Sequence, residues 1–436
     1  MSAGKKRSLS LWIPFLWYAA VSTRGISGWF TLGQTDLAEF DYAMGSPMDR
    51  NFYLTLIIAG VIILVRKRIQ WGKIIRSNPW LFWILVYTFI SILWSNFPLV
   101  AFKRWIKLIG SVVVGLVVLT EYPQVDSIST VLRRCFLVHI PLDVLLVKYF
   151  RTIGVDWDYT GREMWIGLTK QKNPLGQICM TAGIYFIWDV LKKLKEGIVR
   201  YKINILYLLM IFYLLAGPTA EGRSVTSIVI LLIGLFALFG MQFAPKNRTE
   251  INRFFIKGTI VLVLIFIVLS LGMGAFNETI SGEFLRMTGR DETLTGRTEL
   301  WEDMLQIGKK HPIRGVGFGS FWIGDKANNL WERHIWRPQE GHNGYIDIYV
   351  ALGGIGLILF GLFLVSTFSS IKEMVVEDFE FGVFRMVFFI MILLHNLAES
   401  SFLRSEHNLW FLFLLIAMNV PDPVESRGAT DDSETA

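Results

Sequence analysis

The chain alternates between long apolar runs and short polar connections, and this alternation is the strongest pattern in the sequence. A helix needs roughly 20 mainly apolar residues to cross a bilayer, and somewhat fewer when its flanks reach the interface. Twelve stretches satisfy this rule, so the pattern predicts an all-α polytopic membrane protein with about 12 transmembrane helices. The expected spans are 11 to 33, 51 to 66, 79 to 95, 104 to 120, 131 to 150, 173 to 191, 203 to 217, 224 to 243, 256 to 276, 344 to 368, 382 to 398 and 407 to 420.

Basic residues gather in connections that all fall on one side of the membrane if the twelve spans are right. They lie at 5 to 7, 66 to 76, 192 to 202 and 246 to 257. By the positive-inside rule this side is cytoplasmic, and so are both termini. We expect the first stretch, which follows Lys5, Lys6 and Arg7, to remain as an uncleaved helix. The segments expected on the outer, periplasmic side are 34 to 50, 151 to 172, 218 to 223, 277 to 343 and 399 to 406.

The composition supports the membrane assignment. Hydrophobic residues make up 53% of the chain and charged residues 18%, which is more apolar surface than a soluble fold of 436 residues could bury. The net charge of +7 is explained by the cytoplasmic connections, so we do not expect nucleic-acid binding. Cys135 and Cys179 both lie in apolar segments and are expected to be inert packing residues. The acidic tail 421 to 436 is expected to be disordered and cytoplasmic.

The outward segment 277 to 343, between the ninth and tenth expected helices, is too long for a simple connector and too short for an ordinary independent domain. We therefore expect it to pack on the membrane body. Within it, residues 295 to about 310 have the pattern of a short helix that ends at His311 and Pro312. The glycine-rich stretch 315 to 320 that follows predicts a tight turn whose backbone N–H groups could face an anion.

Three ionisable residues near the expected outer interface are candidates for chemistry, because charged groups at membrane depth are rare unless they function. Arg223 lies on a short outward turn and Arg297 near the start of the loop helix, although either could be an ordinary interfacial or surface arginine. His342 stands where the outer loop enters the tenth helix and could accept a proton as a general base. Asp347, five positions further on, does not stack beneath it, so no His–Asp dyad is expected.

One reaction would use all three of these residues. Glycosyl transfer from a lipid diphosphate leaves a doubly charged anion, and its stabilisation needs either a divalent metal or two arginines. The carboxylates of Asp36, Glu39 and Asp41 are candidate metal ligands, but only on their spacing. Two arginines and a base form the alternative without a metal or cofactor, and this is the arrangement we expect.

The stretches around these residues resemble a bacterial family that comprises O-antigen ligases, O-antigen polymerases and exopolysaccharide polymerases. The resemblance is carried by residues 296 to 301 (GRTELW), 311 to 321 (HPIRGVGFGSF) and 341 to 345 (GHNGY). It implies an inner-membrane glycosyltransferase that takes its saccharide from undecaprenyl diphosphate at the periplasmic face. It further implies that Arg223 and Arg297 hold the diphosphate, and that His342 activates the acceptor hydroxyl for an inverting attack.

Two further stretches favour the polymerase subtype over the ligase. Residues 169 to 176 (TKQKNPLG) and 396 to 401 (NLAESS) resemble motifs of exopolysaccharide polymerases. The resemblance makes a glycan, or the lipid A-core of a ligase, the expected acceptor, with a chain-length regulator as a possible partner. The accessory site candidates from these motifs and from 341 to 345 are Lys170, Lys172, Asn173, Asn343, Tyr345 and Glu399.

Two other functions are compatible with the pattern. A transporter or flippase of lipid-linked saccharides also has about twelve helices, but the sequence shows neither a repeat nor paired broken helices, and it has a single oversized outer loop. A glycosyltransferase with an acidic base among Asp36, Glu39 and Asp41 is the second alternative. It would lose activity when one of these carboxylates is changed and keep it when His342 is changed.

Overall fold

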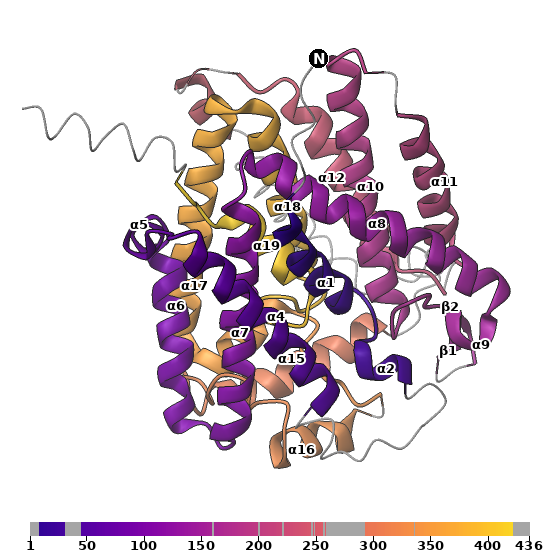
Figure 1. The fold of residues 1–436 in the computed structure, drawn as a ribbon. Helices are drawn as coiled ribbons and strands as arrows, with labels where there is room; N and C mark the ends of the chain where they lie inside the picture. Colours follow the sequence, from indigo (N-terminus) through magenta and orange to yellow (C-terminus); the bar gives the residue numbers. More distant parts are fainter. Residues whose placement is uncertain are drawn as a thin grey trace, which may run out of the picture.

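The structure is a computed structural model, and it describes residues 8–30, 45–158, 161–198, 201–219, 222–245, 247, 249–255, 258, 293–334 and 336–421. These residues form a helical bundle with one small hairpin (Figure 1). The chain is therefore an all-α membrane protein. The expected carboxylates Asp36, Glu39 and Asp41 and the tail after residue 421 lie outside the described residues.

The first half of the bundle is built from helices of very different length. It comprises η1 (Leu9–Leu11), α1 (Trp12–Val21), α2 (Ile26–Phe30), α4 (Pro47–Arg66), α5 (Trp71–Ser77), α6 (Pro79–Ile90), η2 (Ser91–Trp94), α7 (Pro98–Leu119) and α8 (Gln124–Tyr149). Proline opens α4, α6 and α7, where its missing N–H has no partner to lose. In Figure 1, α6 and α7 run side by side with α17, whereas α8 crosses toward the opposite flank.

The second half contains the two strands and the remaining helices. It comprises α9 (Arg151–Gly154), β1 (Val155–Trp157), β2 (Glu163–Trp165), α10 (Lys172–Lys195), α11 (Lys202–Ala216), α12 (Val225–Met241), α15 (Thr293–Gly308), α16 (Asp325–Arg333), α17 (Gly344–Glu377), α18 (Phe379–His395) and α19 (Asn408–Ala417). The strands pair antiparallel, with Val155 opposite Trp165. Helix α18 packs against both α17 and α12, and so joins the two flanks.

Every expected span except 256 to 276 coincides with helix in the described parts of the chain, and that one lies outside them apart from Gly258. The first expected span is broken, because α1 ends at Val21 and α2 begins only at Ile26. By length and hydropathy, three described helices are each sufficient to cross a membrane, namely α4, α10 and α17. The number rises to five if each of two sharply bent pairs, α5 with α6 and α7 with α8, counts as one span.

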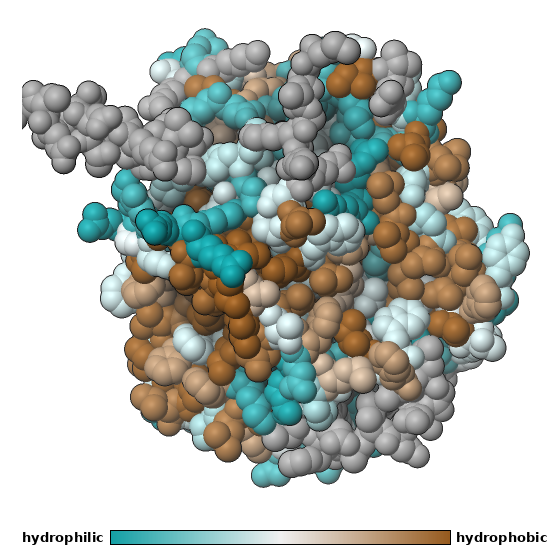
Figure 2. Space-filling model, in the orientation of Figure 1, coloured by the Kyte–Doolittle hydropathy of each residue, from teal (hydrophilic) through white to brown (hydrophobic). Residues whose placement is uncertain are grey.

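The shorter apolar helices divide into lipid-facing and interior ones. All ten residues of α19 are buried, so its hydrophobicity serves packing inside the protein. In contrast, α11 leaves Leu206, Leu209 and Phe212 exposed. Figure 2 shows hydrophobic residues over the flanks of the visible face, as expected for a surface that meets lipid. Cys135 and Cys179 are buried and unpaired, which agrees with a packing role.

Helix α17 is interrupted at Gly353, which has φ 66° and ψ −163°, a conformation open only to glycine. The glycine-rich stretch of the outer loop fills the break. The amides of Val316 and Gly317 donate to the carbonyls of Val350 and Ala351 at 3.0 and 2.9 Å. On the other side of the break, the amides of residues 354 and 355 donate to the carbonyls of 312 and 313.

The expectation that this stretch presents its amides to an anion is wrong for residues 315 to 318. The amide of Gly315 donates to the carbonyl of His311, and that of Phe318 donates to Oγ of Ser91 at 3.0 Å. With the two bonds to α17, four successive amides are thus used within the protein. The stretch anchors the segment between α15 and α16 to α17, which is a structural role.

Candidate active site

The site forms where the start of α17 meets the connection between α18 and α19. Asn343 caps α17, its side-chain oxygen accepting from the amides of Tyr345 and Ile346, both at 3.1 Å. Its own amide donates to Oγ of Ser400, and the amide of Gly344 donates to the carbonyl of Asn396. A side chain placed on Gly344 would collide with Asn396, so the two segments are in close contact.

This contact brings His342 onto Glu399. Nδ1 of His342 lies 2.8 Å from Oε2 of Glu399. Since a carboxylate can only accept, Nδ1 carries the proton of this bond, and in the neutral imidazole Nε2 is then the free acceptor. Within the described residues no hydrogen bond reaches Nε2. His342 also has φ 46°, a left-handed conformation that is unusual for a residue other than glycine and is frequent at functional sites.

Glu399 is the centre of the site, and two more elements reach it. Oε1 of Glu399 accepts from Nη2 of Arg297 at 3.1 Å and from Nδ2 of Asn173 at 2.7 Å. Arg297 belongs to α15, which packs on α17 through the buried side chains of Leu300 and Met304. Its Nη1 also donates to the carbonyl of Ala398 at 2.6 Å. The side chain of Glu399 is only 4% exposed, so its charge is balanced almost entirely by protein groups.

Asn173 reaches Glu399 because the connection that precedes α10 is firmly held. Nη2 of Arg24 donates to the carbonyls of Gly167 and Thr169 at 3.0 and 2.9 Å. Oδ1 of the buried Asp143 accepts from the amide of Leu168 at 2.8 Å. These bonds fix the start of α10 and therefore the direction of the Asn173 side chain.

The charges of the site shift two pKa values in opposite directions. Burial alone would lower the pKa of His342, but the Glu399 charge, the hydrogen bond to it and the nearby Glu340 together raise it. Burial alone would raise the pKa of Glu399, but His342 and Arg297 hold it well below its usual range. Glu399 is therefore a carboxylate throughout the physiological range, and His342 takes up a proton more readily than an ordinary histidine.

Glu340 is a third member of this group. Its Oε1 lies 3.5 Å from Nδ1 of His342, and its Oε2 is paired with Nη1 of Arg404. Burial raises the pKa of Glu340, although Arg404 and His342 act against it. One potential ligand atom from each of Glu340, His342 and Glu399 lies within 4.8 Å of the others, so a metal ion would have its donors here. However, Arg297 and Arg404 already neutralise the two carboxylates, and a cation would have to displace these pairs.

Arg223 lies in a pocket beside this group rather than on Glu399. The pocket is lined by polar and cationic groups from Lys172 and Arg223 and by apolar side chains that include Trp165 and Leu214. Nε of Arg223 is buried and has no hydrogen-bond partner in the described structure. A buried donor without a partner calls for a ligand or water. Because Lys172 directly precedes Asn173, the first turn of α10 connects this pocket to Glu399.

The remaining predicted residues have separate positions. Lys170 is exposed, and none of the hydrogen bonds described above involves its side chain. The hydroxyl of Tyr345 donates to the carbonyl of Leu393 at 3.1 Å, so it ties α17 to α18. Asp347 accepts from the amide of Gly341 and from Nε1 of Trp322, and has no hydrogen bond to His342 in the described structure, as the helix spacing predicted.

Sequence reasoning missed three features of the site. It placed Glu399 among the accessory residues without its pairing to His342, because the two are 57 positions apart. It also passed over Glu340 and Arg404. The one available signal was the position of Glu340, only two residues before the proposed base.

Two comparisons with known proteins give similarities for this chain. A family described as O-Antigen ligase matches residues 205–361, which include Arg223, Arg297 and His342. The chain is also similar to the exopolysaccharide production protein ExoQ of Rhizobium meliloti (strain 1021), with 28% identity over 384 residues, which cover 85% of this chain and 82% of the relative. The protein is a membrane protein of polysaccharide biosynthesis. It is similar to the family of O-antigen ligases, O-antigen polymerases and exopolysaccharide polymerases.

Proposed function

We propose that the protein is a glycosyltransferase that moves saccharide from an undecaprenyl-diphosphate donor to a hydroxyl of a growing glycan, with His342 as the general base. The observation that carries this proposal is the hydrogen bond between Nδ1 of His342 and the carboxylate of Glu399. It fixes the tautomer in which Nε2 is the acceptor, and it stabilises the imidazolium that forms when a proton arrives.

The reaction follows from this tautomer. The acceptor oxygen forms a bond to the anomeric carbon while the bond from that carbon to the diphosphate oxygen breaks, and the hydroxyl proton moves to Nε2 of His342. Attack on the side opposite the leaving group inverts the anomeric centre. The proton on His342 is later released to solvent, and Glu399 remains a carboxylate throughout.

Arg223 and Arg297 would hold the departing diphosphate. A guanidinium has five N–H donors, and Arg297 uses one on Ala398 and one on Glu399, which leaves further donors for phosphate oxygens. The buried Nε of Arg223 is unpartnered, as expected for a group whose ligand is an anion. Lys172 adds a third cation to the Arg223 pocket. Together they would supply the counter-charge without a metal.

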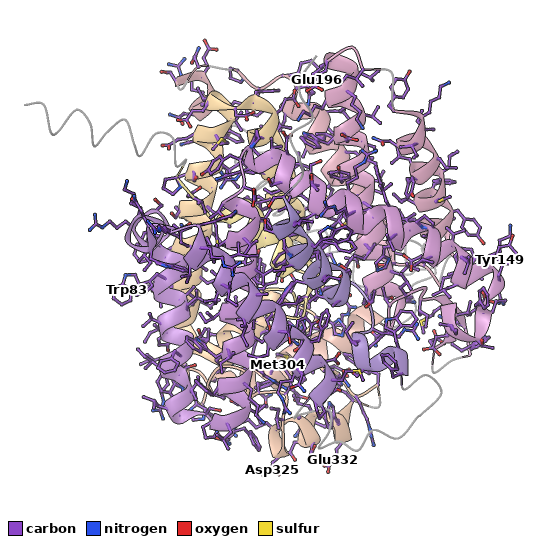
Figure 3. All side chains as sticks on the ribbon, viewed as in Figure 1. Trp83, Tyr149, Glu196, Met304, Asp325 and Glu332 are labelled. Atoms are coloured by element: carbon purple, nitrogen blue, oxygen red, sulfur yellow. The ribbon has the colours of Figure 1, made fainter. Side chains whose placement is uncertain are left out.

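We further propose that the site faces the periplasm, with twelve membrane helices, both termini in the cytoplasm and residues 277–343 as the outer loop between helices nine and ten. Figure 3 supports opposite sides for the basic connections and for the loop that contains α16. Glu196, which follows α10 within the basic stretch 192 to 202, lies at one end of the molecule, and Asp325 and Glu332 of α16 lie at the other. The basic connections point to the cytoplasm.

A polymerase is favoured over a ligase. The relative named above is an exopolysaccharide production protein, and Asn173 and Glu399, which come from the two polymerase-like motifs, contact each other at 2.7 Å. The acceptor would then be a lipid-linked or growing glycan rather than lipid A-core. A chain-length regulator remains an expected partner.

The test is transfer by purified, reconstituted protein with lipid-linked oligosaccharide extracted from the producing cells. We expect wild type to form product in excess chelator, and His342→Ala to slow transfer by a factor of roughly 100 to 10,000 while donor binding is retained. Product that grows by whole repeat units identifies a polymerase, and single addition to lipid A-core identifies a ligase.

Two outcomes would overturn the proposal. Equal activity of wild type and His342→Ala would remove the base, and would favour a carboxylate such as Asp36, Glu39 or Asp41 in its place. Movement of the intact donor across the bilayer without any product would identify a transporter or flippase.

A further inference from the structure

Three tryptophans surround the segment that leads to His342, and two of them have structural hydrogen bonds. Nε1 of Trp301 donates to the carbonyl of Gly341 at 2.7 Å, and Nε1 of Trp331 donates to the carbonyl of Pro338 at 2.6 Å. These bonds hold both ends of residues 338 to 341. The amide of Arg337 donates to the carbonyl of His334 at 2.9 Å, which closes the turn that contains Trp336.

Trp336 differs from the other two. Its side chain is 39% exposed, and no hydrogen bond of its indole is present in the described part of the chain. Its ring centroid lies 5.4 Å from that of His342, with 49° between the ring planes. Arg337, the next residue, has φ 45°, so the chain accepts a strained conformation directly after this tryptophan. A large aromatic ring is therefore held beside the proposed base and left partly open.

The surroundings of this ring define what it can bind. The other groups next to His342 are charged, namely Glu340, Glu399 and, through Glu399, Arg297. A ligand that fits here must offer hydroxyls to charged groups and an apolar face to an aromatic ring. Sugar rings have this composition, since their C–H bonds form a flat apolar face and their hydroxyls point outward. An aromatic ring with an apolar body and a polar N–H suits such a mixed surface.

We propose that Trp336 is the platform for the sugar ring that carries the accepting hydroxyl. The ring would stack on the indole, and its hydroxyl would point to Nε2 of His342, whose proton-accepting side has no partner among the described residues. The inference rests on the proposed function and adds the specificity-determining contact for the acceptor. Trp336 takes no proton and is not a catalytic residue.

The test compares steady-state transfer by reconstituted wild type, Trp336→Ala, Trp336→Phe and Trp83→Ala. Trp83 is a matched control, because it is 53% exposed on α6 and lies on the flank of the molecule (Figure 3). The donor and acceptor are the lipid-linked oligosaccharide and the lipid-free oligosaccharide released from it by mild acid. We expect Trp336→Ala to raise the acceptor KM roughly five- to tenfold, with Trp336→Phe restoring most of the loss.

A structural role for Trp336 would give a different result. If the ring only holds His342 in place, Trp336→Ala lowers kcat and moves the pH dependence of transfer, while the acceptor KM stays constant. That outcome overturns the inference, and so does an equal change in Trp83→Ala. If Trp336 is a platform, kcat of Trp336→Ala stays within about twofold of wild type. Its pH midpoint stays at the wild-type value, because His342 keeps its bond to Glu399.

A direct binding measurement separates this inference from the proposed function. If wild type makes no product, the proposed function fails, but equilibrium dialysis with the radiolabelled lipid-free oligosaccharide still tests the platform. Binding to wild type that is lost in Trp336→Ala and kept in His342→Ala supports it. Equal binding by wild type and Trp336→Ala, or no binding by either, overturns it.

Discussion

Nδ1 of His342 lies 2.8 Å from Oε2 of Glu399, a residue 57 positions further along the chain, in the connection between α18 and α19. The carboxylate also accepts from Arg297 and Asn173, so four elements meet at one side chain. A base held in this way has a defined tautomer and a pKa set by its partner.

The first prediction concerns the pH dependence of transfer. His342 must be neutral to accept a proton, and its pKa is raised, so the rate of wild type should rise with pH and reach half its plateau above about 6.5, the ordinary value for histidine. Glu399→Gln removes the charge that raises this pKa and leaves the burial that lowers it. The midpoint of the variant should therefore move to lower pH.

The plateau rate of Glu399→Gln should fall by less than that of His342→Ala. The amide oxygen can still accept from Nδ1, but the amide then turns its NH2 toward the donors of Arg297 and Asn173. The measurement is the initial rate of transfer between pH 5 and pH 9. A midpoint that stays at the wild-type value would show that Glu399 does not control the base.

The second prediction ranks the two carboxylates near His342. Glu340 lies 3.5 Å from Nδ1 and is paired with Arg404, whereas Glu399 lies at 2.8 Å and accepts a hydrogen bond from Nδ1. Glu340→Gln should therefore shift the midpoint in the same direction as Glu399→Gln, but less. The same rate measurements check the order, and the reverse order would identify Glu340 as the main partner of the base.

The third prediction separates donor binding from proton transfer. Arg223→Ala should raise the donor KM by roughly ten- to hundredfold, because a hydrogen bond to a charged group contributes about 1.5 to 3 kcal/mol. Arg223→Lys should recover only part of this loss, since it keeps the charge but removes the buried Nε donor. The pH midpoint should stay at the wild-type value in both variants.

Lys170→Ala is the control for the third prediction, because Lys170 is an exposed cation on the connection before α10. We expect it to bind the donor as wild type does. If Lys170→Ala raises the donor KM as much as Arg223→Ala, the effect reflects the charge of the whole surface rather than a defined diphosphate site.

The fourth prediction concerns metal ions at Glu340, His342 and Glu399. Both carboxylates already have arginine partners, so excess chelator should leave transfer unchanged. Added Zn²⁺ should inhibit, because a metal on His342 would block proton transfer, and the inhibition should weaken in Glu340→Gln. Activity that is lost with chelator and restored by Mg²⁺ or Mn²⁺ would contradict the metal-free proposal.

The fifth prediction concerns the break in α17. Gly353→Ala places a Cβ 2.3 Å from the carbonyl oxygen of Ile313 and forces φ 66° on a residue that disfavours it. We expect the free energy of unfolding to fall by roughly 1 to 3 kcal/mol, together with loss of transfer. Gly361→Ala on the same helix meets nothing within 4 Å and should melt like wild type. Equal melting temperatures in nanodiscs would show that the break is not required.

The sequence was sufficient for the long helices and for some residues of the site, but not for their contacts. Apolar runs located the long helices, since burial in lipid and burial in protein both demand such runs, but not the short helices α5, α9 and α16. For the same reason they could not show that α19 is buried rather than lipid-facing. The motifs identified His342, Arg297 and Glu399, yet nothing in their spacing predicts that all three meet.

The role of the glycine-rich stretch illustrates a different limit. Its composition indicated a turn with free amides, but the amides of residues 315 to 318 all have partners within the protein. The partners of those amides, the carbonyls of Val350 and Ala351, become available only because α17 is interrupted at Gly353. Helix propensity gives little sign of such a break, because a glycine in an apolar helix is common and most do not interrupt it.

The completion of α17 by the outer loop bears on how the protein is made. The carbonyls of Val350 and Ala351 have their described partners in residues 316 and 317, so this helix cannot satisfy its own backbone as it enters the bilayer. The loop must therefore dock on α17 before the segment 344 to 352 has all of its backbone partners. His342 lies two residues before that segment, so we expect its position to depend on the docked loop.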